Sequence, residues 1–212
     1  VSRGWNNGAT STVGAVTWVN GTNGNIAGTS SPGGAVSTAN SLVGSGANES
    51  EGNDSFSFTA TPGGGVNVLA NGNYIVNNPR ALGGRGAVTW VDAANGNIAG
   101  GASPGGVVSA SNSLVGGTTS DRIGFNGIAL LPNGNYVVIS SDFQVFGVPG
   151  GAVTLGNGAS GTVGTVSASN SLVGGNLCLG GCGGTGDRIG GALFGSGGVT
   201  VLANGNYVVN SP

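Results

Sequence analysis

Three acidic residues at corresponding places in a repeated pattern are the first candidates for chemistry in this sequence. They are Asp54, Asp121 and Asp187, and an arginine follows directly after Asp121 and Asp187. Such a set predicts either ligand positions repeated on each unit, or carboxylates that cap a turn or pair with the neighbouring arginine. We favour the structural interpretation.

Aromatic residues form a second repeated set. Trp18 and Trp90 end corresponding segments, and Leu155 stands at this place in the third copy. An exposed tryptophan could stack on a sugar ring, but leucine fills volume and cannot stack, so packing is favoured. The tyrosine after each Asn-Gly-Asn turn is expected to pack with its hydroxyl at the rim. These tyrosines are Tyr74, Tyr136 and Tyr207.

The two cysteines lie close together in a glycine-rich segment. Cys178 and Cys182 belong to Leu-Cys-Leu-Gly-Gly-Cys, which is an insertion in the third copy. Two cysteines cannot supply the four ligands of a structural zinc site. A local disulfide is favoured and would indicate an oxidising compartment. The alternative is a loop with two unpaired thiols.

The remaining chemistry is sparse. Glu49, Glu51 and Asp54 form the only acidic cluster of the sequence, which could hold a divalent cation weakly but is expected to be a solvated loop. A carboxylate pair could also hydrolyse glycosides, but no matched pocket can be inferred. Histidine and lysine are absent, which excludes an imidazole base, a Ser-His-Asp triad and a Schiff base. We expect no enzyme, no cofactor and no metal ion.

Composition excludes further classes of function. The chain has 212 residues, of which 48 are glycine and 6% are charged, and its net charge is −2. The five arginines are scattered, so no basic face for nucleic acid is expected. No apolar run approaches the roughly 20 residues of a membrane span. The sequence opens on Val1 without an initiator methionine, so we expect it to be processed or cut from something longer.

Three phrases recur three times in a fixed order, at spacings from 58 residues (positions 113 to 171) to 72 residues (positions 14 to 86). A repeat of that size is one supersecondary unit that stacks on its copies to share a core. The sequence therefore predicts a single repeat domain with approximate units 1–79, 80–141 and 142–212. The phrases are Gly-Ala-Val-Thr (14–17, 86–89, 151–154), Ser-Leu-Val-Gly (41–44, 113–116, 171–174) and Asn-Gly-Asn-Tyr (71–74, 133–136, 204–207).

Each unit is expected to contain four short strands. Residues 198–202 and 207–209 read as a hairpin around the turn at 203–206, where Asn-Gly favours positive φ. Residues 14–19 predict a third strand and residues 35–43 a fourth. No segment has helical periodicity, and glycine would cost a helix about 1 kcal/mol per residue.

The fold class predicted is all-β, with three four-stranded repeats of about 60–70 residues arranged as β-propeller-like blades. The alternative is a β-solenoid, whose coils are usually shorter than this period. Three blades are fewer than the roughly four to eight of an ordinary propeller. The chain would therefore close an unusually small ring, join another chain, or be a segment of a longer array.

Several phrases resemble a tandem repeat of large secreted bacterial surface proteins of the haemagglutinin or adhesin type. They are Asp-Arg-Ile-Gly at 187–190, the segment 198–209 and Gly-Ala-Val-Thr at 151–154. The resemblance covers nearly the whole chain. It implies an extracellular or bacterial cell-surface setting and no particular activity.

A weaker resemblance is to the FG-GAP blade of integrin-type propellers. Residues 121–124, 133–136 and 151–153 follow the order of that blade. The calcium loop of that family is rich in aspartate, whereas here it is reduced to Asn-Gly-Asn-Tyr. Because carboxylates are what bind Ca²⁺ well, calcium is not carried over.

The two ends of the sequence complement each other. Residues 207–212 match the second strand of a unit, and residues 1–5 lead into the third strand at 14–18. The internal join from 74–80 to 86–90 shows the same pieces in continuous chain. Such ends could meet within one chain to close a ring, or between chains, because an unfinished sheet edge is a template for pairing.

The leading hypothesis is a structural, non-enzymatic building block of a bacterial extracellular filament, surface layer or adhesin stalk. It would assemble with copies of itself through complementary β-sheet termini. The alternative is a propeller-type lectin that binds surface glycans through equivalent loops. An enzyme is a distant third class because histidine and lysine are missing.

Overall fold

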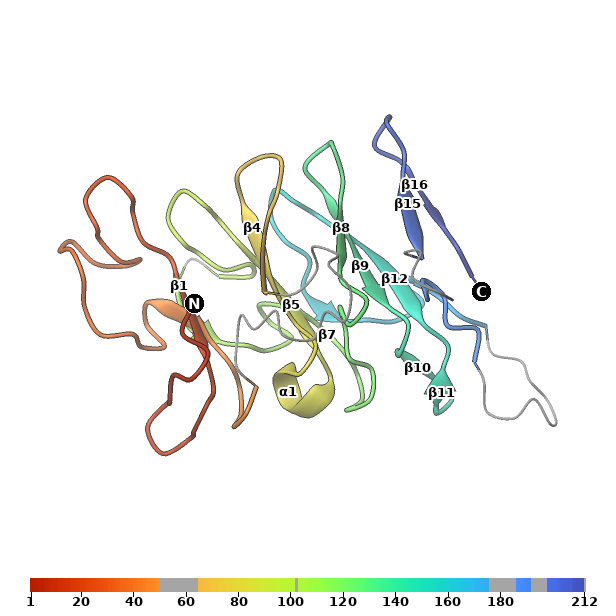
Figure 1. Cartoon of the computed structure of the whole chain (residues 1–212), viewed down its shortest axis with the longest axis horizontal. Coiled ribbons are helices and arrows are strands. Elements are labelled where there is room, and N and C mark those ends of the chain that lie inside the picture. Colours follow the sequence, from red (N-terminus) through yellow and green to blue (C-terminus); the bar gives the residue numbers. More distant parts are fainter. Residues whose placement is uncertain (50–64, 102, 176–185, 192–197, 212) are drawn as a thin grey trace.

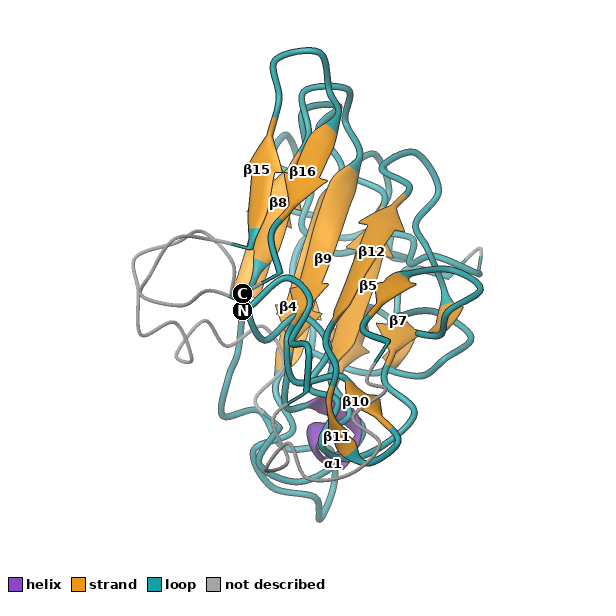
Figure 2. Ribbon diagram, turned by 90° about the vertical axis from the view of Figure 1, so that its right-hand side faces the viewer, coloured by secondary structure: helices purple, strands orange, loops and turns teal. Residues whose placement is uncertain are grey.

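The computed structural model describes residues 1–49, 65–101, 103–175, 186–191 and 198–211. Short β-sheets follow one another along the long axis of the molecule, and the N- and C-termini lie at opposite ends of this stack (Figure 1). Viewed along the stack, the strands of successive sheets lie one behind another (Figure 2). The chain is thus a mostly-β protein built from several small sheets.

We call the sheets formed within residues 65–115 and 128–173 the middle repeat and the third repeat, and these ranges differ from the predicted units 80–141 and 142–212. The middle repeat contains four antiparallel strands built from the predicted phrases. A hairpin of β3 (Gly65–Val68) and β4 (Tyr74–Asn78) pairs with β5 (Ala87–Val91), which pairs with β7 (Leu114–Val115). The hairpin turn needs glycine because Gly72 has a φ of 89°. Asn-Gly at this place therefore sets the register in which Val68 lies opposite Tyr74.

The third repeat builds the same antiparallel sheet, and partial sheets lie on either side of the two complete ones. In the third repeat, as in the middle one, the hairpin pairs with the third strand, and the third strand pairs with the fourth. Its strands are β8 (Ile128–Leu130), β9 (Tyr136–Ser140), β12 (Ala152–Gly156) and β14 (Leu172–Val173). The partial sheets contain β1 (Ala15–Thr17) with β2 (Ser41–Val43), and β15 (Val199–Val201) with β16 (Tyr207–Val209).

Adjacent repeats are linked because a short strand of each later repeat pairs with the fourth strand of the repeat before it. β6 (Gly106–Val107) from the middle repeat pairs in parallel with β2, and β13 (Gly164–Thr165) from the third repeat pairs in parallel with β7. The backbone amides of Val108 and Val166 extend these ladders to the carbonyls of Val43 and Val115 at 3.0 and 2.9 Å. The fourth strands β2 and β7 are therefore paired on both edges, once by their own repeat and once by the next, whereas β14 pairs only with β12 among the described residues.

The core lies between the sheets because the inner sheets are apolar on both faces. Alternate residues of a strand point to opposite faces. Ile75 and Trp90 join one cluster with Val138 of the next sheet, whereas Val76 and Val91 join another with residues of β1 and β2. A third cluster lies between β9 and the β15–β16 hairpin. The sheets of the middle and third repeats therefore each pack against a neighbouring sheet on both faces.

Two different short elements connect the second and third strands at the base of the stack (Figure 1). The middle repeat has a single helical turn, α1 (Ala81–Gly84), in which Leu82 and Gly83 have positive φ. The third repeat instead has a small hairpin of β10 (Gln144–Val145) and β11 (Val148–Pro149). The helical turn departs from the predicted absence of helix, and the positive φ values explain why no helical pattern marks it.

The predicted propeller and the alternative solenoid both need correction. In the described residues the sheets form neither a closed ring nor solenoid coils. A propeller returns its last blade to its first, but here the two terminal sheets are separated by the whole length of the stack (Figure 1). The predicted boundaries at 79 and 141 stay a prediction.

Candidate functional site

A buried carboxylate holds the loop that follows the fourth strand. The side chain of Asp121 is buried, and its Oδ2 accepts hydrogen bonds from the backbone amides of Gly117 and Thr118 at 2.6 and 2.7 Å. Its Oδ1 accepts from the Thr118 hydroxyl at 2.8 Å and from the backbone amide of Gln144 at 3.0 Å. Four donors satisfy both oxygens from inside the protein, which is the arrangement of a structural cap rather than of a ligand site.

The first repeat fills this position with Glu49. Its carboxylate accepts from the amide and the hydroxyl of Ser45 at 2.6 and 2.8 Å and from the Gly83 amide at 3.2 Å. The spacing from the preceding glycine, Gly44 to Glu49 and Gly116 to Asp121, is five residues in both repeats and is the signal that could have found it.

The other predicted acidic positions divide between described and undescribed residues. Asp187 accepts from the Gly175 amide at 2.8 Å, in the manner of Asp121. Asp54 and Glu51 lie outside the described residues, as do Cys178 and Cys182 with their predicted disulfide. Within the described ranges, no group of three acidic, histidine or cysteine side chains could hold a metal ion.

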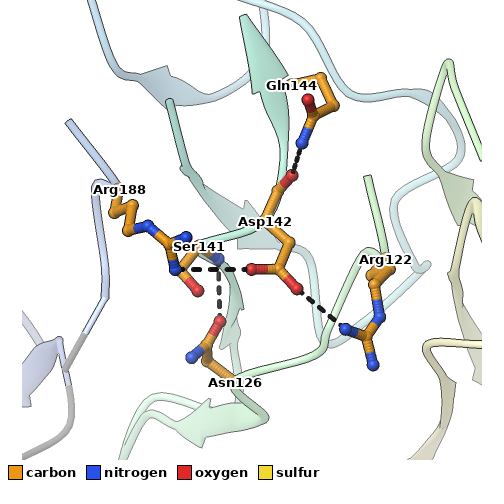
Figure 3. Close-up of polar contacts among 6 residues, drawn as sticks. All are labelled: Arg122, Asn126, Ser141, Asp142, Gln144 and Arg188. Atoms are coloured by element: carbon orange, nitrogen blue, oxygen red, sulfur yellow. Dashed lines mark hydrogen bonds and ion pairs between the residues drawn. The ribbon is translucent and has the colours of Figure 1, made fainter. Parts of the chain in front are cut away.

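The arginines after the aspartates pair with Asp142, a residue that sequence reasoning missed (Figure 3). Arg122 Nη1 lies 3.1 Å from Asp142 Oδ2, and Arg188 Nη1 lies 4.0 Å from Asp142 Oδ1. Both arginines have a φ of 46°, a left-handed conformation that is uncommon for residues other than glycine. Both arginines pair with Asp142, whereas Asp121 and Asp187 accept hydrogen bonds from backbone amides.

Neighbouring groups hold this ion network in place. The guanidinium of Arg122 lies 3.7 Å from the centre of the Phe125 ring, a cation–π contact. Gln144 Nε2 donates to the carbonyl oxygen of Asp142 at 2.7 Å, and Asn126 Oδ1 accepts from the Ser141 amide at 2.8 Å. Partly exposed ion pairs contribute about 0–1 kcal/mol each, so the network joins two repeats with little gain in stability.

The tryptophans lie in the contacts between repeats. Trp18 Nε1 donates to the carbonyl oxygen of Ala93 at 2.8 Å, and Trp90 Nε1 donates to that of Gly158 at 2.9 Å. Each acceptor belongs to the loop after the third strand of the next repeat. Ala93 follows Trp90 by three residues, and Gly158 follows Leu155 by three residues. Leu155 is the matching residue of the third repeat and is half-exposed.

Asparagine side chains of the hairpin turns bind the same loops. The Gly158 carbonyl also accepts from Asn71 Nδ2 at 2.8 Å and Asn73 Nδ2 at 3.1 Å. In return, the Gly158 amide donates to Asn135 Oδ1 at 3.0 Å, and the Ala93 amide donates to Asn73 Oδ1 at 3.1 Å. The Asn-Gly-Asn turns therefore join neighbouring loops and sheets in addition to reversing the chain.

The tyrosines after these turns pack between sheets. Burial raises the pKa of both Tyr74 and Tyr136 to about 12. The expected position of the hydroxyl at the rim is wrong for Tyr136, which is fully buried. Its ring occupies the space opposite Gly156, where a Cβ would overlap it.

A polar network joins the third and fourth strands identically in all three repeats. A threonine hydroxyl on the third strand lies 2.6–2.7 Å from a serine hydroxyl on the fourth, which in turn donates to the asparagine before it at 2.8–2.9 Å. In the part of the chain that the structure describes, these hydroxyls bond to one another and to the asparagine side chain, and so tie the two strands together. The triplets are Thr17–Ser41–Asn40, Thr89–Ser113–Asn112 and Thr154–Ser171–Asn170.

These contacts define a mostly-β tandem-repeat protein whose recurring residues connect one sheet to the next. The chain belongs to a family of repeats of unknown function (DUF5650), which matches residues 1–53, 68–125, 130–177 and 201–212. No curated protein and no solved structure matches the chain. Among the described residues, no helix has the length and apolar character that a membrane crossing requires.

Proposed function

We propose that this chain is a structural, non-enzymatic building block that forms an extracellular filament, surface layer or adhesin stalk of a bacterium. It lengthens when one copy stacks on the next through the same sheet-to-sheet contacts that hold its own repeats together. The observation that carries the proposal is that apolar residues buried in the middle repeat have equivalents that are exposed towards the two ends of the stack.

The face of the third repeat that points towards the C-terminal hairpin is half covered. Leu114 is 0% exposed in the middle repeat, but the equivalent Leu172 is 54% exposed. Trp90 is 7% exposed, but the equivalent Leu155 is 47% exposed. The β15–β16 hairpin packs on β8 and β9, and Val153 of the third strand joins this cluster. Leu155 and Leu172, further along the third and fourth strands, stay exposed.

The opposite terminal sheet has the complementary feature. Val19 is 52% exposed, whereas Val91, its equivalent in the middle repeat, is 2% exposed. β1 and β2 are the third and fourth strands of the first repeat. In a stack of two copies, β1 and β2 of the second copy would lie over Leu155 and Leu172 of the first. β1 would then pair with β16 as β5 pairs with β4, except at Ala15, whose backbone amide and carbonyl already bond to Ser2.

The lectin alternative gains no support from the aromatic residues. The indole N–H groups of Trp18 and Trp90 donate to backbone carbonyls of the next repeat. The recurring carboxylates of Glu49 and Asp121 accept internal donors. The bacterial, extracellular setting is carried by the resemblance to haemagglutinin-type repeats.

Sedimentation velocity over a range of chain concentrations tests the proposal. The chain is expected to form a series of larger species, and Leu172→Lys is expected to reduce them to the monomer. The matched control is Phe146→Lys, which adds the same charge to a side chain 90% exposed at the base of the stack. A monomer at all concentrations, or equal loss of assembly in both variants, would overturn the proposal.

A further inference from the structure

Asparagine followed by glycine is the sequence most prone to spontaneous deamidation, and this chain contains nine such pairs. We propose that two of them, Asn7-Gly8 and Asn20-Gly21, are the modification sites of the folded chain, and that folding protects the other seven. The pairs are Asn7-Gly8, Asn20-Gly21, Asn23-Gly24, Asn71-Gly72, Asn95-Gly96, Asn126-Gly127, Asn133-Gly134, Asn157-Gly158 and Asn204-Gly205.

The chemistry needs only water. The backbone nitrogen of the glycine attacks Cγ of the asparagine side chain, and the C–N bond of the side-chain amide breaks. The nitrogen loses its proton, ammonia leaves, and a five-membered succinimide forms. Water then opens this ring at either carbonyl, giving aspartate or isoaspartate. The balance is one amide and one water converted to one carboxylate and one ammonium ion, with no oxidation or reduction.

The glycine N–H decides which pairs can react, because a nitrogen whose hydrogen is bound to an acceptor must first break that bond. Seven glycine amides donate to an acceptor within the protein, at 2.8–3.0 Å. In the hairpin turns the acceptor is the carbonyl that closes the turn, as for Gly72 with Leu69. The seven protected amides are those of Gly24, Gly72, Gly96, Gly127, Gly134, Gly158 and Gly205.

The amides of Gly8 and Gly21 have no acceptor among the described residues, and both glycines are exposed. The contrast is clearest at one loop position. Gly158 of the third repeat corresponds to Gly21, and its amide donates to Asn135 Oδ1 at 3.0 Å. The first repeat has no hairpin asparagine over Gly21 within the described chain, so this nitrogen is free to react.

The middle repeat shows what the aspartate product would do at residue 20. Asp92 stands there, and its Oδ1 accepts from the Ala94 amide at 2.8 Å. Asn20 Oδ1 accepts from the Thr22 amide at the same distance. Conversion to aspartate thus keeps this turn and adds one negative charge, whereas isoaspartate adds a carbon to the main chain and breaks the turn.

The test is incubation of the folded chain in mildly alkaline buffer made with heavy-oxygen water, followed by peptide mapping by mass spectrometry. Label is expected first at Asn7 and Asn20. The other seven should lag on the order of tenfold, because one amide hydrogen bond must be given up. In urea all nine pairs should react at similar rates. Equal rates among all nine pairs in the folded chain, or a faster reaction at any of the seven, would overturn the proposal.

Two variants separate this cause from general exposure. Gly21→Ala adds a Cβ that meets no atom within 4 Å, and it should suppress labelling at Asn20 while Asn7 still reacts. Asn135→Ala removes the acceptor of the Gly158 amide and should bring Asn157 to the rate of Asn20. Near-ultraviolet circular dichroism checks that this variant is folded. Unchanged labelling of Asn157 in a folded Asn135→Ala chain would contradict the role of the hydrogen bond.

Discussion

Trp90 Nε1 donates a hydrogen bond to the carbonyl oxygen of Gly158 at 2.9 Å, across 68 residues of sequence. Trp18 makes the equivalent bond to Ala93 at 2.8 Å, across 75 residues. Each indole therefore fixes the loop of the following repeat while its ring fills the space between two sheets. A donor that is buried together with its acceptor stabilises the contact and also specifies its register.

Truncation of Trp90 should destabilise the stack strongly. Trp90→Ala removes a buried ring and leaves a cavity, so we expect the free energy of unfolding to fall by about 3–5 kcal/mol. Urea unfolding followed by circular dichroism measures this change. Leu155→Ala is the matched control at the equivalent, half-exposed position and should cost about 1 kcal/mol or less. Similar losses in the two variants would contradict the role given to Trp90.

The close approach of the loop to the hairpin turn can be tested at Gly158. A Cβ there would overlap the carbonyl oxygen of Gly134, so Gly158→Ala should lower the thermal midpoint by the several degrees that about 1–3 kcal/mol of overpacking produces. Ala93 occupies this position in the middle repeat, so the backbone itself accepts a Cβ. Gly21→Ala is the control, because no atom lies within 4 Å of the added carbon.

The carboxylate cap should be sensitive to loss of its charge. Asp121→Asn directs an amide group towards N–H donors, leaving at least one of them without an acceptor, and should cost about 1–3 kcal/mol. Asp92→Asn removes the same charge at an exposed turn where the other repeats already have asparagine. Chemical denaturation should show a loss for Asp121→Asn and almost none for Asp92→Asn.

Buried tyrosines make stability fall at high pH. The pKa of Tyr74 and Tyr136 is raised from 10.0 to about 12, so the folded chain keeps protons that the unfolded chain releases between these values. The stabilisation is complete below pH 10 and is lost above it, at up to about 1.4 kcal/mol per pH unit for each tyrosine. Urea midpoints measured from pH 8 upwards should decline, and Tyr136→Phe should flatten the decline by about half. A slope unchanged by Tyr136→Phe would contradict the burial argument.

Strand positions could be predicted from local sequence because each phrase specifies its own geometry. Gly-Ala-Val-Thr forms β1, β5 and β12, and Asn-Gly-Asn-Tyr forms the hairpin turns, where positive φ requires glycine. Threonine and serine at fixed places in two phrases meet as hydroxyl pairs. These features depend on residues close in sequence or on exact repetition.

The path of the stack and the partners of the arginines could not be predicted this way. A closed ring of sheets and an open stack of sheets bury the same apolar faces. They differ in the angle between one sheet and the next, which no single sequence phrase specifies. Arg122 pairs with Asp142, 20 residues further along the chain, and the residue types next to Arg122 do not specify that partner. Matching acidic positions by residue type points to Asp54 in the first repeat, whereas the five-residue spacing from Gly44 identifies Glu49 as the cap.

Negative-stain electron microscopy of the chain at rising concentration tests the central claim most directly. Open stacking predicts thin rods that grow in length and keep one width, because each added copy covers Leu155 and Leu172 of the copy before it. Uniform discrete particles, or closed rings of fixed diameter, would contradict a protein that assembles by stacking in a line.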